Sequence, residues 1–429
     1  MHGPDAMLKV TFCAYDCADN VGGPVAWIQR LLPALRLQGI ACRCLFLTYG
    51  PSPSGPTLSA LRAEGFECPS TVYQQYTEDR ARWLLAQLSE NPPDVFVPSL
   101  VLAGYFAARW VRRAGIPTVG ILHSDDDYYR GLQKEFVFGR REFRVSGLVC
   151  VSRELEQQVL LARPRGTAVR RIPYGVPVPP APVERRTTGL RLAYVGRLVE
   201  EQKRISELTR ALCRVVRGVP GTEAVMYGDG PDRTNVENVL AVEGAGLPVR
   251  LAGRVESDQI QQQLFECQVI VLLSDYEGLP IALMEGMACG CVPVCLRMRS
   301  GIPELIEDGV TGILVDDRAD SFINAIRRLR REPGLWERLS RAARARILTE
   351  YSNGSSVKQW AELLRQLHEH SGPRGAIHIP GRMHLPPVNP AFGSADVREI
   401  RPSLPICIYR RGRMFAGRVR RRLLGRPIP

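Results

Sequence analysis

Residues 274–294 constrain the fold of this chain more than any other stretch. Residues 269–273, just before it, are a short apolar run rich in β-branched side chains, which predicts a buried strand of a parallel sheet. After a short turn, apolar residues at helical spacing predict a helix with Pro280 at its first position and Gly290 at its end. Residues 292–296 predict the next strand, so the stretch is one strand–helix–strand unit.

Two carboxylates belong to this unit. Glu277 falls in the turn, and Glu285 falls on the helix about one turn in. A helix N-terminus exposes free N–H groups and a positive dipole end, which suits a phosphate group. At about 1.5 Å of rise per residue, Glu285 would lie roughly 7 Å along the axis from that end. A diphosphate at the helix end and a ribose diol on Glu285 would therefore fit one nucleotide, with Glu277 toward the sugar. Two solvated glutamates on an ordinary strand–helix unit explain the pattern equally well.

The residues around these glutamates carry a family resemblance. E-G-L-P at 277–280, seven residues between the glutamates, and M-A-C-G-x-x-P-V at 287–294 resemble the signature of retaining GT-B glycosyltransferases of the family-4 type, the glycosyl transferases group 1. Gly286 stands where the family more often has Ala. The resemblance covers roughly residues 8–369. It implies an α/β fold with two Rossmann-like domains facing across a cleft, the donor mainly in the second and the acceptor mainly in the first.

Two features of the first half belong to the same expectation. Residues 9–15 predict a strand, residues 16–24 a loop that contains Gly22 and Gly23, and residues 25–38 a helix. Adjacent glycines allow a ligand close to the backbone, and the resemblance implies that they face the donor diphosphate and the acceptor.

His123 ends the strand predicted over residues 118–122. A lone histidine there is more often structural, but the carboxyl ends of strands in open α/β sheets line the ligand crevice. The resemblance implies that this histidine contacts the transferred sugar or its surroundings.

The run of three aspartates at residues 125–127 permits two interpretations. It could be the D-x-D metal site of the single-domain glycosyltransferase fold, or a solvated acidic loop near the mouth of the acceptor site. We favour the acidic loop, because the longer motif lies in the second half of the chain. We therefore predict no metal site.

A second series of strands and helices begins near residue 192. The V-G-R-L motif at residues 195–198 and the lysine that follows it resemble another segment of the same family. This segment contains Arg197 and Lys203, one of only four lysines in the chain. Cations are unfavourable at a helix start unless an anion binds there. The resemblance implies that both neutralise the departing diphosphate, helped by the backbone of Gly278, Leu279 and Ile281.

The predicted domain organisation follows from a Pro-rich stretch. Residues 1–175 form the acceptor-side domain, residues 176–189 the linker, and residues 190–350 the nucleotide-sugar domain. A closing helix at residues 351–369 returns to the first domain. From residue 371 the composition shifts to a basic, Pro-containing extension.

The positive charge of the chain is concentrated in that extension. The chain has a net charge of +13, and residues 372–429 hold twelve arginines, no lysine, one Asp and one Glu, a net +10. Arginines with interleaved apolar side chains near residues 411–423 suit an anionic membrane surface. A solvated disordered extension is an equal alternative, and nucleic acid is the least favoured partner because the rest of the chain is near neutral.

The composition bears on the compartment. The N-terminus lacks the pattern of a signal peptide, and no apolar stretch is long enough to span a bilayer. The twelve cysteines are too few for a disulfide scaffold, and Cys289, Cys291 and Cys295 lack the partners of a zinc site. We predict a cytoplasmic protein, with peripheral contact at the inner membrane face.

The resemblance implies the transfer of a sugar from a nucleotide-sugar donor, with retention, to a hydroxyl of an unidentified acceptor, for which a glycan or a lipid-linked molecule is a candidate. The nucleotide sugar would be a co-substrate, and no other cofactor is expected. A GT-B nucleotide-sugar epimerase and a non-catalytic nucleotide-sugar-binding protein are the alternatives.

Overall fold

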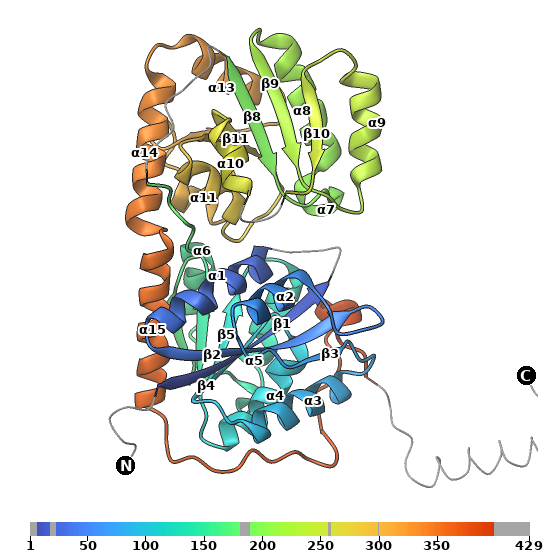
Figure 1. Cartoon of the computed structure of the whole chain (residues 1–429), viewed down its shortest axis with the longest axis vertical. Helices are drawn as coiled ribbons and strands as arrows, with labels where there is room; N and C mark the ends of the chain where they lie inside the picture. Colours follow the sequence, from blue (N-terminus) through green and yellow to red (C-terminus); the bar gives the residue numbers. More distant parts are fainter. Residues whose placement is uncertain (1–6, 18–22, 181–188, 256–258, 299, 399–429) are drawn as a thin grey trace, which may run out of the picture.

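The computed structural model contains two parallel sheets, one above the other in Figure 1, each flanked by helices. It describes residues 7–17, 23–180, 189–255, 259–298 and 300–398. We call the lower sheet and its helices the N-terminal domain, and the upper sheet and its helices the C-terminal domain.

The N-terminal domain has a seven-stranded sheet in the order β3-β2-β1-β4-β5-β6-β7. The strand order reverses direction between β1 and β4, which is where open α/β sheets bind ligands. The strands are β1 (Leu8–Cys17), β2 (Ile40–Tyr49), β3 (Ser70–Val72), β4 (Val95–Ser99), β5 (Thr118–Leu122), β6 (Gly147–Cys150) and β7 (Ala168–Arg171). The helices are α1 (Gly23–Leu37), α2 (Pro56–Ala63), α3 (Thr77–Glu90), α4 (Leu102–Arg113), α5 (Asp127–Phe136) and α6 (Arg153–Leu161), with the 3₁₀ turn η1 (Arg141–Phe143).

The C-terminal domain has a six-stranded sheet in the order β10-β9-β8-β11-β12-β13, with the same reversal between β8 and β11. The strands are β8 (Leu190–Val195), β9 (Thr222–Tyr227), β10 (Val249–Gly253), β11 (Val269–Leu272), β12 (Val292–Leu296) and β13 (Ile313–Val315). The helices are α7 (Glu200–Lys203), α8 (Ile205–Gly218), α9 (Arg233–Glu243), α10 (Ile260–Phe265), α11 (Ile281–Ala288), α12 (Ile302–Leu305), α13 (Asp320–Arg331) and α14 (Leu335–Glu350).

The strands could be predicted from the sequence because their side chains are buried. Every residue of β4, β5, β6 and β11 is buried, because helices cover both faces of a parallel sheet and select continuous apolar runs.

Two predicted helix starts were wrong by one or two positions. Helix α1 begins at Gly23 rather than residue 25, because Pro24 fits a first turn, where its missing N–H costs nothing. Helix α11 begins at Ile281, with Pro280 as the preceding cap residue. Pro280 keeps an extended ψ of 107°, while its carbonyl accepts a hydrogen bond from the Met284 amide at 3.3 Å.

The last helix returns to the N-terminal domain. Helix α15 (Asn353–Glu369) lies beside the lower sheet, and α14 lies beside the upper one (Figure 1). The predicted helix start at residue 351 was wrong: Tyr351 separates the two helices, and Ser352 caps α15. The Val176 amide donates to the Tyr351 carbonyl, and the Asn353 amide donates to the Val176 carbonyl, both at 3.0 Å. The segment that follows β7 is therefore hydrogen-bonded to the start of α15, the helix that returns to the N-terminal domain.

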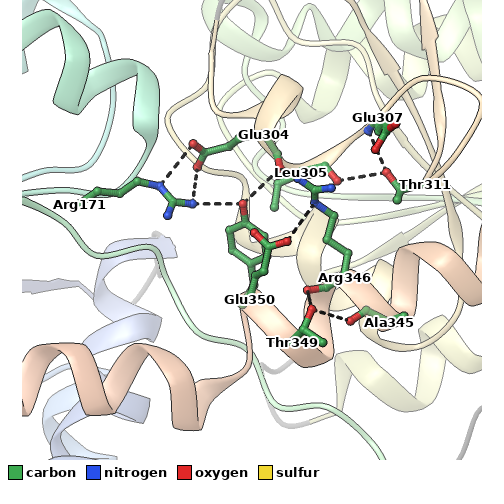
Figure 2. A network of polar contacts seen from close by, with 10 residues as sticks. Arg171, Glu304, Leu305, Glu307, Thr311, Ala345, Arg346, Thr349 and Glu350 are labelled. Atoms are coloured by element: carbon green, nitrogen blue, oxygen red, sulfur yellow. Dashed lines mark hydrogen bonds and ion pairs between the residues drawn. The ribbon is translucent and has the colours of Figure 1, made fainter.

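A polar network beside this crossing joins the two domains (Figure 2). Arg171 of β7 forms an ion pair with Glu304 of α12, with 3.5 Å between Nε and Oε2. The Glu304 carboxylate also accepts the Arg153 amide at the start of α6, at 2.6 Å. Arg346 of α14 donates to the Glu304 carbonyl at 2.8 Å. The Glu304 side chain thus holds two groups from the other domain.

The alternative of a solvated disordered extension is wrong for the first part of the segment that follows residue 371. Ile377, Met383 and Phe392 are buried against the N-terminal domain, and the buried Asp396 accepts a hydrogen bond from the Thr77 hydroxyl at 3.0 Å. The 3₁₀ segment η2 (Pro390–Ala395) lies against α5. These apolar residues are too sparse to form a core alone, so their burial depends on the existing domain. The arginine-rich residues 411–423 lie outside the described residues.

Within the described parts of the chain, no helix combines the length and the apolar character that crossing a membrane requires.

Candidate active site

A cavity of about 470 Å³ lies between the two domains. Its lower wall comes from α1 and α2, and its upper wall comes from α10, α11 and the carboxyl ends of β8, β9 and β10. This is the edge of a parallel sheet at which ligands bind, next to the reversal between β8 and β11. The lining includes Gly23, Arg30, Arg197, Gly228, Ile281 and Glu285.

Glycines give the upper wall an exposed backbone. The Gly228 amide donates to the Gly253 carbonyl at 2.8 Å, and the Gly196 amide donates to the Tyr227 carbonyl at 3.0 Å. Gly228 has φ of +151°, and a Cβ there would lie 1.9 Å from the Gly196 carbonyl oxygen. Only glycine fits this position. Because Gly196 and Gly228 have no side chains, this part of the cavity wall consists of main-chain atoms.

Glu285 projects into this cavity from α11 and is only 5% exposed. Its Oε1 lies 2.6 Å from the Nη2 of Arg30, which belongs to α1 of the other domain. Burial raises the pKa of the Glu285 carboxyl, and the charge and hydrogen bond of Arg30 oppose that rise. Glu285 is thus part of the cavity wall, with one of its oxygens engaged by Arg30.

Glu277 is placed beside Lys203. The Lys203 Nζ lies 2.5 Å from Glu277 Oε1, and both side chains are nearly buried. The Gln202 side chain donates to the second oxygen, Oε2, at 3.4 Å. The structure therefore brings together two residues assigned to different parts of the donor, the sugar and the diphosphate. Neither is among the residues that line the cavity described above.

Arg197 follows β8 and is exposed, and it does line the cavity. Its backbone is fixed because the Tyr194 hydroxyl donates to the Arg197 carbonyl at 2.8 Å. Its guanidinium makes a 3.4 Å contact with the Gln202 side chain. A fixed backbone with an exposed guanidinium suits the capture of an anion that enters from solvent.

The turn before α11 contacts the other domain through its backbone. A Cβ on Gly278 would lie 2.0 Å from the His123 carbonyl oxygen, so the two main chains touch across the cleft. The Gly278 carbonyl accepts the Gly301 amide at 2.8 Å. Leu279 is buried, and Ile281 begins α11 and lines the cavity. The first-turn amides of α11 are the type of unpaired donors that bind phosphate.

His123 is buried, and its ring is enclosed by aromatic side chains. Its ring packs against Trp27 and Tyr129, and its Nδ1 lies 2.5 Å from the Tyr174 hydroxyl. Burial lowers the pKa of His123 to about 3, so the ring is neutral at physiological pH. Its Nε2 is buried and has no hydrogen-bond partner among the described residues, which leaves one unmet hydrogen bond in either tautomer.

Gly22 and Gly23 were predicted to face the donor and the acceptor, and the structure describes only one of them. Gly22 lies outside the described residues. Gly23 begins α1 and lines the cavity, and a Cβ there would lie 3.5 Å from the Ile281 side chain. The start of α1 therefore leaves room for little more than a methyl group beside Ile281 of α11.

The aspartates at 125–127 have local partners. Asp126 caps α5 by accepting the Tyr129 amide at 3.1 Å, and Asp125 and Asp127 each pair with Arg130 at 3.2 Å. Across the described residues, no group of three or more His, Cys, Asp or Glu side chains is arranged to hold a metal ion.

Two residues of the site, Arg30 and Tyr174, were not among those predicted from the sequence. Nothing local distinguishes Arg30, because the chain contains 53 arginines and this one lies on an ordinary amphipathic helix. Tyr174 stands at a position where the resembled family often has Asn, and only the folded structure shows its bond to His123.

The architecture and the cavity define a class of fold, and comparison with solved structures agrees. The structure of Anabaena HepE with UDP has a TM-score of 0.66 at 17% identity, covering 84% of this chain and 100% of that one. The pneumococcal O-GlcNAc transferase GtfA has a TM-score of 0.69 at 13% identity, covering 84% and 99%. The fold is the two-domain GT-B fold of glycosyltransferases.

Sequence comparison gives the family. Residues 189–332 match the family described as glycosyl transferases group 1, and residues 21–178 match glycosyltransferase family 4. The chain therefore belongs to the group 1 glycosyltransferases.

Two curated relatives illustrate the range of the family. Alpha-D-kanosaminyltransferase of Streptomyces kanamyceticus is 30% identical over 175 residues, and the amylovoran biosynthesis glycosyltransferase AmsK of Erwinia amylovora is 33% identical over 186 residues. The matched part is 41% and 42% of this chain, respectively, and 45% of each relative, so the chain spans about half the length of the curated relatives that it matches.

Proposed function

We propose that this protein is a retaining glycosyltransferase that moves a sugar from a nucleotide-sugar donor to a hydroxyl group. The observation that carries the proposal is the interdomain cavity, where a glycine-lined wall, the Glu285 carboxylate and the Arg197 guanidinium converge. Family membership supports the same reaction, and the titles of related structures name UDP or UDP-glucose as ligands of those proteins.

The proposed donor-binding roles follow the geometry. The base and ribose lie against the backbone after β8–β10, and Glu285 accepts ribose hydroxyl groups through its second oxygen. The diphosphate lies at the N-terminus of α11, with Arg197 and Lys203 supplying positive charge. Glu277 holds the position of Lys203 and offers its other oxygen to the sugar.

In the proposed reaction, the bond between the anomeric carbon and the phosphate oxygen breaks, and the acceptor oxygen bonds to that carbon on the same face. The acceptor proton passes to the leaving diphosphate, so no protein nucleophile is required. Arg197, Lys203 and the α11 amides stabilise the developing negative charge. His123 stays neutral and does not serve as an acid; its Nε2 is a candidate hydrogen-bonding group for the sugar or its surroundings. The reaction needs neither a metal ion nor a cofactor other than the donor.

The acceptor is proposed to be a glycan or a lipid-linked molecule. Residues 399–429 carry nine arginines and one glutamate, a net +8, and this charge favours an anionic membrane surface. We propose that the protein acts in the cytoplasm with peripheral contact at the inner membrane face. Salt-sensitive flotation with vesicles that contain anionic lipid would be expected for the full chain and would be lost without residues 399–429.

The function is tested in two steps. Thermal unfolding with a panel of nucleotide sugars identifies the donor, and mass spectrometry then distinguishes a transferred sugar from an epimerised donor or a donor that is only bound. NMR of the product gives its anomeric configuration. Inversion of the anomeric centre or exclusive epimerisation would contradict the proposal.

Two substitutions test the assigned roles. Glu285→Ala should mainly weaken donor binding, whereas Glu277→Ala should lower turnover more than affinity, because Glu277 holds the Lys203 charge near the leaving group. Glu332→Ala is the control, since among the described residues that exposed carboxylate, at the end of α13, forms an ion pair with Arg328 and is not part of the cavity lining. Wild-type kinetics in both site variants would refute the assignment.

A further inference from the structure

One ion pair of the candidate site joins the two domains. Arg30 lies on α1, Glu285 lies on α11, and the two side chains are 18% and 7% exposed at a separation of 2.6 Å. Both residues line the cavity, so the pair is part of its wall.

Burial makes each partner dependent on the other. A carboxylate removed from water is stable as an ion only if a nearby cation and hydrogen bonds replace its hydration. Arg30 supplies that charge to Glu285 Oε1. Arg30 therefore offsets part of the cost of burying the charged carboxylate and holds it through one oxygen, while a ribose hydroxyl group would bind to the other oxygen.

The pair also depends on how closely the two domains approach. The Gly278 backbone lies against the His123 carbonyl of the other domain, and the start of α1 lies near Ile281, where a Cβ on Gly23 would come within 3.5 Å of the Ile281 side chain. Arg30 can reach Glu285 only while these surfaces are together, because the two residues lie on helices of different domains.

We infer that Arg30 is a positioning residue of the donor site, which acts through Glu285 and makes ribose recognition depend on closure of the N-terminal domain. The inference rests on the proposed function, because it takes Glu285 as the ribose partner. It adds a charged side chain of the N-terminal domain to the ribose end of the donor site.

The structure offers a matched control. The Arg171–Glu304 pair also joins the two domains, but neither residue lines the cavity (Figure 2). If Arg30 only ties the domains together, Arg30→Gln and Arg171→Gln should affect nucleotide binding alike.

The experiment is calorimetric titration of the full chain with UDP, GDP, ADP and CDP. The tightest of these is then compared with its 2′-deoxy counterpart, which removes a hydroxyl group from the ribose. The wild type should prefer the ribonucleotide. Arg30→Gln should lower affinity for the ribonucleotide about 10- to 100-fold, the range of a hydrogen bond to a charged group, and should reduce the preference for ribose. Arg30→Lys should retain part of the affinity and part of the preference for ribose. Arg171→Gln should keep the wild-type affinity and the wild-type preference.

Three results would overturn the inference. If Arg30→Gln keeps the wild-type affinity and ribose preference, Arg30 does not position Glu285. The same conclusion follows if Arg30→Gln loses equal affinity for the ribonucleotide and for its 2′-deoxy counterpart. If the wild type binds none of the four nucleotides, the proposed function fails, and the inference fails with it. Should Arg30→Gln not fold, Arg30→Lys provides the same comparison.

Discussion

Replacing Gly278 by alanine tests whether the cleft must close by backbone contact. A Cβ at this position would lie 2.0 Å from the His123 carbonyl oxygen and 3.1 Å from the Ser124 Cα. Carbon–oxygen contacts settle near 3.3 Å, so the shortfall is about 1.3 Å. Gly278 is not among the glycines with positive φ, so alanine meets no backbone strain, and the effect is purely one of space.

The clash lies between domains, so the protein can relieve it by opening slightly without unfolding. We expect the melting temperature of Gly278→Ala to stay close to that of the wild type. Turnover should fall about 100-fold, because a displacement near 1 Å of positioned groups has an effect of that order. Nucleotide affinity should fall by less than turnover, because the glycine-lined wall stays intact in the C-terminal domain and only the interdomain Arg30–Glu285 contact is loosened.

The assay is steady-state transfer or donor hydrolysis, with thermal unfolding in parallel. Gly218→Ala is the control: it lies at the end of α8, and a Cβ there has no neighbour within 4 Å. Full turnover by Gly278→Ala would show that the contact between Gly278 and His123 is not needed for activity, and would refute the argument.

The remaining predictions concern His123, the cations and the extension. Because burial lowers the His123 pKa to about 3 from 6.5 in the unfolded chain, only the unfolded state gains a proton between these values, so the free energy of unfolding falls as pH drops through this window. At pH 5 the loss is about 2 kcal/mol, and urea unfolding of His123→Gln should lack it; an unchanged pH dependence would contradict the burial argument. Arg197→Ala and Lys203→Ala should each lower kcat/KM about 100-fold, or about 3 kcal/mol, with chelators having no effect on the wild type. Strict dependence on added magnesium or manganese would instead favour a metal site at the three aspartates. Removing residues 399–429 should leave the melting temperature unchanged, whereas removing residues 371–429 should lower it by several degrees, because the longer deletion takes away buried apolar side chains. Equal melting temperatures for the two truncations would show that the packed segment does not stabilise the domain.

Local pattern alone was enough to predict much of the fold. Residues 292–296 and 118–122 match β12 and β5 residue for residue, because strands buried on both faces must be short and continuously apolar. Serine favours helix N-caps, and Ser152 caps α6, where its hydroxyl accepts the Leu155 amide. The same holds for the turn and helix around Glu277 and Glu285, since their motif lies within one strand–helix unit.

Tertiary structure decided which charges meet. Lys203 and Glu277 are 74 positions apart, and Arg30 and Glu285 lie in different domains, yet each pair is in contact. No local spacing encodes such pairs, because they depend on how two sheets pack against one another. The burial of His123 and the docking of residues 377–396 are of the same kind. Local sequence is enough to specify the helices, the strands and the kinds of side chain at the cleft. The approach of the two domains determines which charged side chains pair, because ion pairing requires proximity in space rather than along the chain.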